Sequence, residues 1–115
     1  MVLHTIERGT GERVVLLHSG GMSSRQWRAF SELACARFRV IAVDFLGSGA
    51  SPPWADDARF ELAVELDALL RSVPTDAPLH LVGHSYGAVI ALRLAAARPA
   101  LGSVFKPLLI RCEAC

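Results

Sequence analysis

The sequence places a serine between two glycines at the junction of two apolar runs. Gly83-His84-Ser85-Tyr86-Gly87 follows the run 79–82 and precedes the run 88–92. A Gly-x-Ser-x-Gly spacing between a strand and a helix puts the serine hydroxyl at the tip of a sharp turn, where it can act as a nucleophile. Neighbouring chain passes so close to such a turn that a Cβ at Gly83 or Gly87 would clash. Alone the motif could be a coincidence, but the strand before it and the helix after it favour a catalytic role for Ser85.

The same turn predicts part of an oxyanion-binding site. Ser85 opens a helix, and the N-terminal N–H groups of a helix favour developing negative charge. The backbone N–H of Tyr86 is then expected to point to the place where an oxyanion would form.

A base for Ser85 is missing from the sequence. A serine hydroxyl is a weak nucleophile until a base takes its proton. The histidines are His4, His18, His80 and His84, and all of them precede Ser85. His84 is adjacent, but neighbours on a sharp turn point apart. The only acidic residue after Ser85 is Glu113, so the order serine, acid, histidine is not completed.

Apolar runs alternate with helical patterns along the chain. We expect strands at residues 2–7, 13–18, 38–45, 78–84 and 103–110, and helices at residues 23–36, 58–72 and 85–98. Strands that alternate with helices form β-α-β units, so we predict an α/β fold. Its sheet is a partial, doubly wound and mostly parallel one, with helices on both faces.

The helical patterns predict which side chains face the core. We expect Trp27, Phe30 and Leu33 on the inner face of the first helix, and Leu62, Leu66, Leu69 and Val73 on that of the second. The third helix is apolar nearly all round, which predicts burial on every side. Pro107 would stand in the middle of the last strand, where it fits only an edge strand or a bulge. We therefore treat residues 100–115 as an atypical tail.

Two further motifs accompany the serine turn. An apolar strand is followed by HSGGMSSRQW from His18 to Trp27, and a second strand by DFLGSGAS from Asp44 to Ser51. Together with the serine motif, in this order, residues 10–100 resemble the N-terminal half of the α/β-hydrolase fold family, in its serine-nucleophile branch. We expect residues 1–115 to form one partial domain of this kind, truncated after the helix that follows the serine.

The resemblance implies a role for each matching residue. Ser85 would be the nucleophile, and Gly20 would provide the second oxyanion N–H beside that of Tyr86. His18 would brace the oxyanion loop, and Asp44 would hold the loop 47–51. Trp27 would pack beneath the site as part of the substrate pocket. Ser19 stands where the family usually has glycine, and it would be strained if its φ were positive.

The composition and charge of the chain limit the classes of partner and cofactor that we expect. The chain has 115 residues, 52% of them hydrophobic, and a net charge of +1 without a basic stripe, so we expect no nucleic-acid partner. No run is long enough to span a membrane and the N-terminus lacks a secretory signal, so we expect a cytoplasmic protein without a membrane partner. Cys112 and Cys115 form a lone C-x-x-C pair, a weak motif, and we expect neither a metal nor an organic cofactor.

The resemblance implies hydrolysis of an ester, thioester or amide through an acyl-Ser85 intermediate, with a small-molecule acyl substrate. Because the acid and the histidine are missing, we expect this chain to be inactive or incomplete. Two alternatives remain open. The chain could be a non-catalytic small-molecule binding module, or half of a two-chain hydrolase with a complementing chain. Its uncovered sheet edge could also favour aggregation.

Overall fold

The computed structural model describes residues 2–56, 59–99 and 107–110. Its strands are β1 (Thr5–Arg8), β2 (Arg13–Leu17), β3 (Arg39–Val43), β4 (Leu79–His84) and β5 (Pro107–Ile110). Its helices are the 3-10 turn η1 (Ser24–Trp27), α1 (Arg28–Ala34), α2 (Leu62–Ser72) and α3 (Tyr86–Ala97). Strands and helices alternate after β1, as the sequence predicts.

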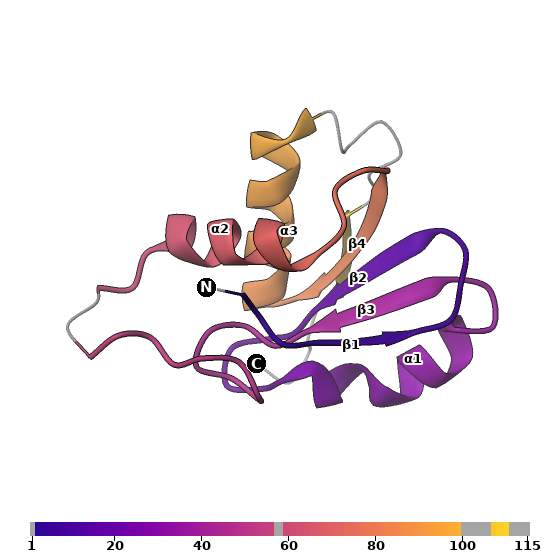
Figure 1. Cartoon of the computed structure of the whole chain (residues 1–115), viewed down its shortest axis with the longest axis horizontal. Coiled ribbons are helices and arrows are strands. Elements are labelled where there is room, and N and C mark those ends of the chain that lie inside the picture. Colours follow the sequence, from indigo (N-terminus) through magenta and orange to yellow (C-terminus); the bar gives the residue numbers. More distant parts are fainter. Residues whose placement is uncertain (1, 57–58, 100–106, 111–115) are drawn as a thin grey trace.

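The described strands form one sheet in the order β1-β3-β2-β4-β5. Strand β1 is antiparallel to β3, and every other pair is parallel. Helix α1 lies on one side of this sheet, and α2 and α3 lie on the other (Figure 1). The predicted α/β architecture, mostly parallel with helices on both faces, is therefore confirmed.

An apolar layer packs on each face of the sheet, because alternate side chains of each strand point to opposite faces. Val15 and Leu17 of β2 join the larger layer beneath α2 and α3. Val14 and Leu16 of the same strand join the smaller layer, which also contains Trp27. Parallel strands buried on both faces explain the continuous apolar runs in the sequence.

The prediction for the inner face of α1 is wrong beyond Trp27. Trp27 is buried, but Phe30 is 38% exposed and Leu33 is 81% exposed. An α-helix turns by 100° per residue, so each three-residue step falls 60° short of a full turn. Leu33 has thereby rotated into solvent, and Ser31, four residues after Trp27, is buried instead.

Helix α3 is buried on one side only, so the prediction of burial all round is wrong. Ile90, Ala91 and Leu94 are fully buried, whereas Val89 and Leu92 are 45% and 49% exposed. The buried set follows the spacing of a single helical face.

Helix α2 begins at Leu62, four residues later than predicted, and Glu61 precedes it without a side-chain cap. Leu69 and Val73 are buried, and Leu62 and Leu66 pack against the core as partly buried side chains. The predicted apolar stripe is therefore present.

Strand β5 is described from Pro107 to Ile110, within the predicted range 103–110. Its first described residue, Pro107, pairs with Leu81 of β4, and residues 103–106 lie outside the described residues. Proline is tolerated at the first position of a strand because its missing N–H is not needed there. Pro107 therefore stands at a position of the described strand where proline is tolerated.

Candidate active site

Ser85 occupies the sharp turn between β4 and α3. Its backbone angles are φ 55° and ψ −111°, and it is the only non-glycine residue with a positive φ among the described residues. Its side chain is exposed and makes no capping hydrogen bond to the helix. The hydroxyl is thus presented to solvent by a strained backbone, and such strain concentrates at functional sites.

The two flanking glycines allow the turn to be this tight. A Cβ on Gly83 would lie 2.5 Å from the carbonyl oxygen of Gly87. A Cβ on Gly87 would overlap the carbonyl oxygen of Leu17 at the end of β2. Helix α3 therefore starts directly against the backbone of β2.

The loop after β2 touches the first residue of α3. A Cβ on Gly20 would lie 3.8 Å from the Cβ of Tyr86. Tyr86 is the first residue of α3, where backbone N–H groups have no intrahelical acceptor. Ser19 does not have a positive φ, whereas Gly21 has a φ of 77°, so the serine is free of left-handed strain.

Both ring nitrogens of His18 make hydrogen bonds to the backbone. Its Nδ1 lies 2.7 Å from the carbonyl oxygen of Ser19, and its Nε2 accepts the backbone N–H of Phe45 at 3.0 Å. Because Nε2 accepts, the proton must be on Nδ1, which donates to Ser19. Burial lowers the pKa of His18. A neutral ring with both nitrogens occupied fastens the loop after β2 to the end of β3.

The Ser19 peptide is held from its other side by Gln26, a residue to which the sequence analysis gave no role. The Ser19 N–H donates to Oε1 of Gln26 at 2.9 Å. The amide nitrogen Nε2 of the same side chain lies 2.5 Å from Nδ1 of His84, the residue before Ser85. No sequence spacing signals this bridge, because Gln26 and His84 come from distant elements.

The side chain of Asp44 connects three segments of the chain, namely His4, the start of η1 and the loop 47–51. It is 2% exposed and accepts hydrogen bonds from the Ser24 N–H at 2.7 Å, the Ala50 N–H at 3.1 Å and His4 Nδ1 at 3.0 Å. Burial raises the pKa of Asp44, but the N–H groups of Ser24 and Ala50 outweigh it and hold the pKa below its usual value. Asp44 is thus a charged anchor for the loop 47–51 and for the start of η1.

A second buried carboxylate, Glu65 of α2, escaped the sequence analysis. It is 1% exposed, accepts the Leu46 N–H at 3.0 Å and accepts the Tyr86 hydroxyl at 2.9 Å. Burial raises the pKa of Glu65, and burial beside that carboxylate also raises the pKa of Tyr86. The only signal in the sequence was an acidic residue within the apolar stripe of α2.

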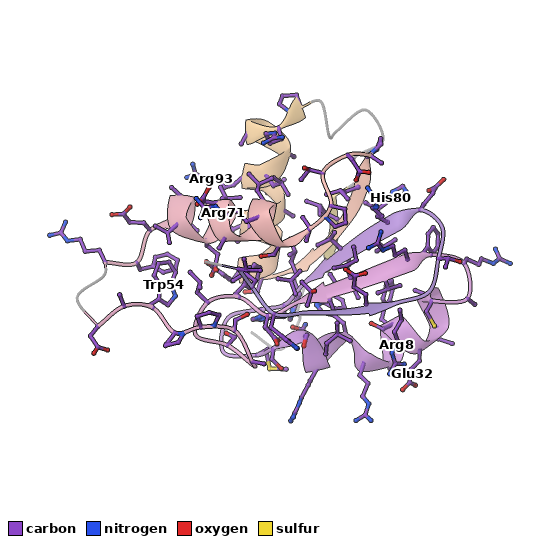
Figure 2. The ribbon with its side chains drawn as sticks, in the orientation of Figure 1. Arg8, Glu32, Trp54, Arg71, His80 and Arg93 are labelled. Atoms are coloured by element: carbon purple, nitrogen blue, oxygen red, sulfur yellow. The ribbon has the colours of Figure 1, made fainter. Side chains whose placement is uncertain are left out.

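A hollow of about 220 Å³, which we call the aromatic hollow after the rings that line it, lies beside Glu65 and Tyr86. Its lining includes Gly20, Phe45, Trp54, Phe60, Glu65 and Tyr86. Trp54 lies between its loop and α2, and its ring is 5.4 Å from that of Phe60 (Figure 2). The hollow is therefore next to both the Gly20 loop and the start of α3.

Trp27, assigned to the substrate pocket in the sequence analysis, lies elsewhere. It packs in the apolar layer with Val14 and Val40, on the face of the sheet opposite α3. It does not line the hollow beside Tyr86. The rings of Trp54 and Phe60 line that hollow.

No histidine of the described residues is hydrogen-bonded to the Ser85 hydroxyl. The four histidines bond elsewhere: His4 to Asp44, His18 to Ser19 and Phe45, His80 to Glu12 at the start of β4, and His84 to Gln26. Figure 2 shows His80 near the start of β4, whereas Ser85 follows the last residue of that strand. The described residues also contain no group of three or more potential metal ligands, and no helix among them is long and apolar enough to cross a membrane.

A mostly parallel α/β sheet with a strained serine between a strand and a helix is the arrangement that defines the α/β-hydrolase fold. The profile of the Alpha/beta hydrolase family matches residues 14–112. The chain belongs to this family.

Relatives and solved structures agree with that assignment. The chain is 43% identical over 96 residues to a pimeloyl-[acyl-carrier protein] methyl ester esterase of Methylococcus capsulatus, covering 84% of this chain and 35% of that protein. It is 33% identical over 98 residues to an (E)-2-((N-methylformamido)methylene)succinate hydrolase of Acinetobacter baylyi, covering 85% of this chain and 37% of that protein. A marine microorganism esterase superimposes with a TM-score of 0.80 at 26% identity, over 96% of this chain and 41% of that structure. The chain thus spans little more than a third of these curated relatives.

Proposed function

We propose that Ser85 is the nucleophile of a serine hydrolase that cleaves carboxylic esters or related acyl bonds. The observation that carries the proposal is the exposed Ser85 hydroxyl on a backbone at φ 55° and ψ −111°. Strain of this kind costs about 1–3 kcal/mol and persists where a function requires it. Within the part of the chain that the structure describes, the hydroxyl makes no capping hydrogen bond to the helix it precedes.

In the proposed reaction, Ser85 Oγ attacks the carbonyl carbon of the substrate while a base takes its proton. The carbonyl π electrons move to the oxygen, and the backbone N–H groups of Gly20 and Tyr86 stabilise the resulting oxyanion. Collapse of this intermediate breaks the bond to the leaving alcohol, which receives the proton, and leaves acyl-Ser85. Water then releases the acid and restores the hydroxyl.

We propose that the base and its orienting acid come from outside residues 1–115. The chain has no histidine after Ser85, and its four histidines make other hydrogen bonds. The residues described here then supply the nucleophile and the oxyanion site, but no group that removes the serine proton. By itself the chain is therefore expected to be inactive or very slow.

A carboxylic ester is the substrate class to test first. The relative from Methylococcus is named a methyl ester esterase, and that from Acinetobacter is named a hydrolase. The hollow between Gly20, Trp54 and Phe60 suits a small apolar or aromatic group on such an ester.

A chimeric enzyme tests this proposal. Residues 1–99 of this chain would replace the matching part of the Methylococcus esterase, whose remainder would contribute the acid and the base. We expect the chimera to hydrolyse p-nitrophenyl butyrate, and Ser85→Ala to lower kcat by about a thousandfold or more. A folded chimera that hydrolyses the ester equally well with Ser85→Ala would refute the assignment of the nucleophile.

A fluorophosphonate probe, with mass spectrometry to locate the adduct, examines the isolated chain. We expect Ser85 to be labelled in the chimera but not detectably in residues 1–115 alone. Thr10→Ala removes an exposed hydroxyl that does not line the hollow and should not change the labelling. Rapid labelling of Ser85 in the isolated chain would overturn the proposal that its base lies outside these residues.

A further inference from the structure

We infer that Gln26 is a positioning residue for the oxyanion site, because its side-chain amide connects the loop of Gly20 to His84, the last residue of β4 before Ser85. This inference rests on the proposed function, since it concerns the donors that the reaction would use. The Gln26 side chain is partly buried on η1, between the two segments that it joins.

The two hydrogen bonds of the Gln26 side-chain amide establish which of its atoms is the oxygen and which is the nitrogen. The backbone N–H of Ser19 can only donate, so the oxygen Oε1 of Gln26 must face it, at 2.9 Å. The amide nitrogen Nε2 then faces Nδ1 of His84 at 2.5 Å and donates to it. His84 must accept at Nδ1, which places its own proton on Nε2 in the neutral ring.

The Ser19 peptide is consequently held at both of its polar atoms. Its N–H is bonded to Gln26, and its carbonyl oxygen accepts Nδ1–H of His18 at 2.7 Å. Gly20 and Gly21 follow immediately, and glycine backbones have wide conformational freedom. The carbonyl oxygen of Ser19 also accepts the Met22 N–H at 3.2 Å, which closes the turn that contains Gly20 and Gly21. The bond to Gln26 therefore fixes the first residue of this turn relative to η1.

That restraint matters because an oxyanion donor acts over a narrow range of distance. Donors stabilise the transition state when they lie about 2.7–3.1 Å from the oxyanion. Gln26 connects the Gly20 loop to His84, and His84 is bonded directly to Ser85 in the chain, so the amide sets the distance between donor and nucleophile. Without it the fold would remain, but the Gly20 N–H would sample positions beyond that range.

Hydrogen exchange in the 115-residue chain tests the bridge without any catalysis. We expect the Ser19 amide to be protected, and Gln26→Met to speed its exchange about tenfold, the value of one hydrogen bond of average strength. His84→Leu should speed it by a smaller factor, and Arg25→Met, on the exposed side of the same turn, should have no effect. Exchange at Val15 in the core should be equal in all four proteins.

Kinetics in the chimera test the consequence for the reaction. Gln26→Met should lower kcat by about tenfold to a hundredfold, less than the loss of a whole oxyanion donor, with little change in KM. Gln26→Met combined with His84→Leu should be no worse than Gln26→Met alone, because both changes break the same bridge.

The outcomes separate this inference from the proposed function. An unprotected Ser19 amide, or equal protection in Gln26→Met and the parent chain, would overturn the bridge even if Ser85 proves to be the nucleophile. Multiplicative losses in the double variant would overturn the action of Gln26 through His84. If the parent chimera is inactive, the hydrolase proposal fails, and the exchange of the Ser19 amide still decides whether Gln26 holds the loop.

Discussion

The hydroxyl of Tyr86 donates a hydrogen bond of 2.9 Å to the carboxylate of Glu65, so a buried acid of α2 holds the residue that follows Ser85. The other carboxylate oxygen of Glu65 accepts the backbone N–H of Leu46 at 3.0 Å. One side chain thereby connects the start of α3 to the loop after β3. The aromatic hollow is built on this connection, since Leu46, Glu65 and Tyr86 all line it.

Glu65→Gln should change how stability depends on pH. Burial raises the pKa of Glu65 in the folded protein, so the folded state binds the proton more tightly than the unfolded state does. The contribution of Glu65 to stability is therefore complete below its unfolded pKa, about 4.3, and is lost as the pH rises through the folded value. We expect the unfolding free energy of Glu65→Gln, relative to the parent, to increase over this window.

Urea unfolding at a series of pH values from 4 to 8 measures this difference. Glu61→Gln, at the exposed residue before α2, is the matched control and should follow the parent curve. Parallel curves for Glu65→Gln and the parent would contradict the effect of burial on the Glu65 pKa.

Asp44→Asn should shift the pH dependence in the opposite direction. Hydrogen bonds from Ser24 and Ala50 hold the pKa of Asp44 below its usual value, so its contribution is present above the unfolded pKa and is lost as the pH falls through the folded one. The asparagine cannot accept as many hydrogen bonds, and we expect it to lower the unfolding free energy by about 2–3 kcal/mol at pH 7. The deficit should shrink as the pH falls below about 4, in a urea series extended to pH 2, whereas a deficit that is constant with pH would argue against a charged Asp44.

Gly87→Ala should be strongly destabilising. Its added Cβ would overlap the backbone carbonyl of Leu17, which cannot move without shifting β2, so we expect a loss of about 3 kcal/mol or more. Gly20→Ala is the control, because its Cβ would meet Tyr86 at an ordinary 3.8 Å, and we expect a change below about 0.5 kcal/mol. Thermal and urea unfolding compare the two variants, and equal losses would contradict the close packing of α3 on β2.

The parts of the site that sequence could predict are those set by local geometry. The turn at Ser85 follows from the spacing of Gly83 and Gly87 between a strand and a helix. The contacts of Gln26 and Glu65 could not be predicted, because their partners His84 and Tyr86 come from other elements and are fixed only by tertiary packing. A polar residue that is buried by a distant partner leaves no periodic signal in its own segment.

The errors in the predicted core have a similar origin. A spacing of three residues suggested one face for Trp27 and Leu33, but each three-residue step along α1 falls 60° short of a full turn and rotates Leu33 away from Trp27. The position of Trp27 on the α1 side of the sheet, with Trp54 in the hollow, depends on which way η1 turns from β2. The sequence pattern indicates that a helix follows β2 but not which of the two aromatic rings reaches the hollow.

Ser85→Gly should make the protein more stable, whereas Ser85→Ala should change its stability little. Serine and alanine both carry a Cβ and are strained at φ 55° and ψ −111°, by about 1–3 kcal/mol, while glycine adopts these angles without that cost. Glycine also increases the entropy of the unfolded chain, which offsets about 0.5–1 kcal/mol of the gain. We therefore expect Ser85→Gly to raise the unfolding free energy by about 1 kcal/mol relative to Ser85→Ala in urea titrations. Because both variants lack the hydroxyl, the comparison isolates the strain from the chemistry, and a glycine variant less stable than the alanine one would refute the strained turn.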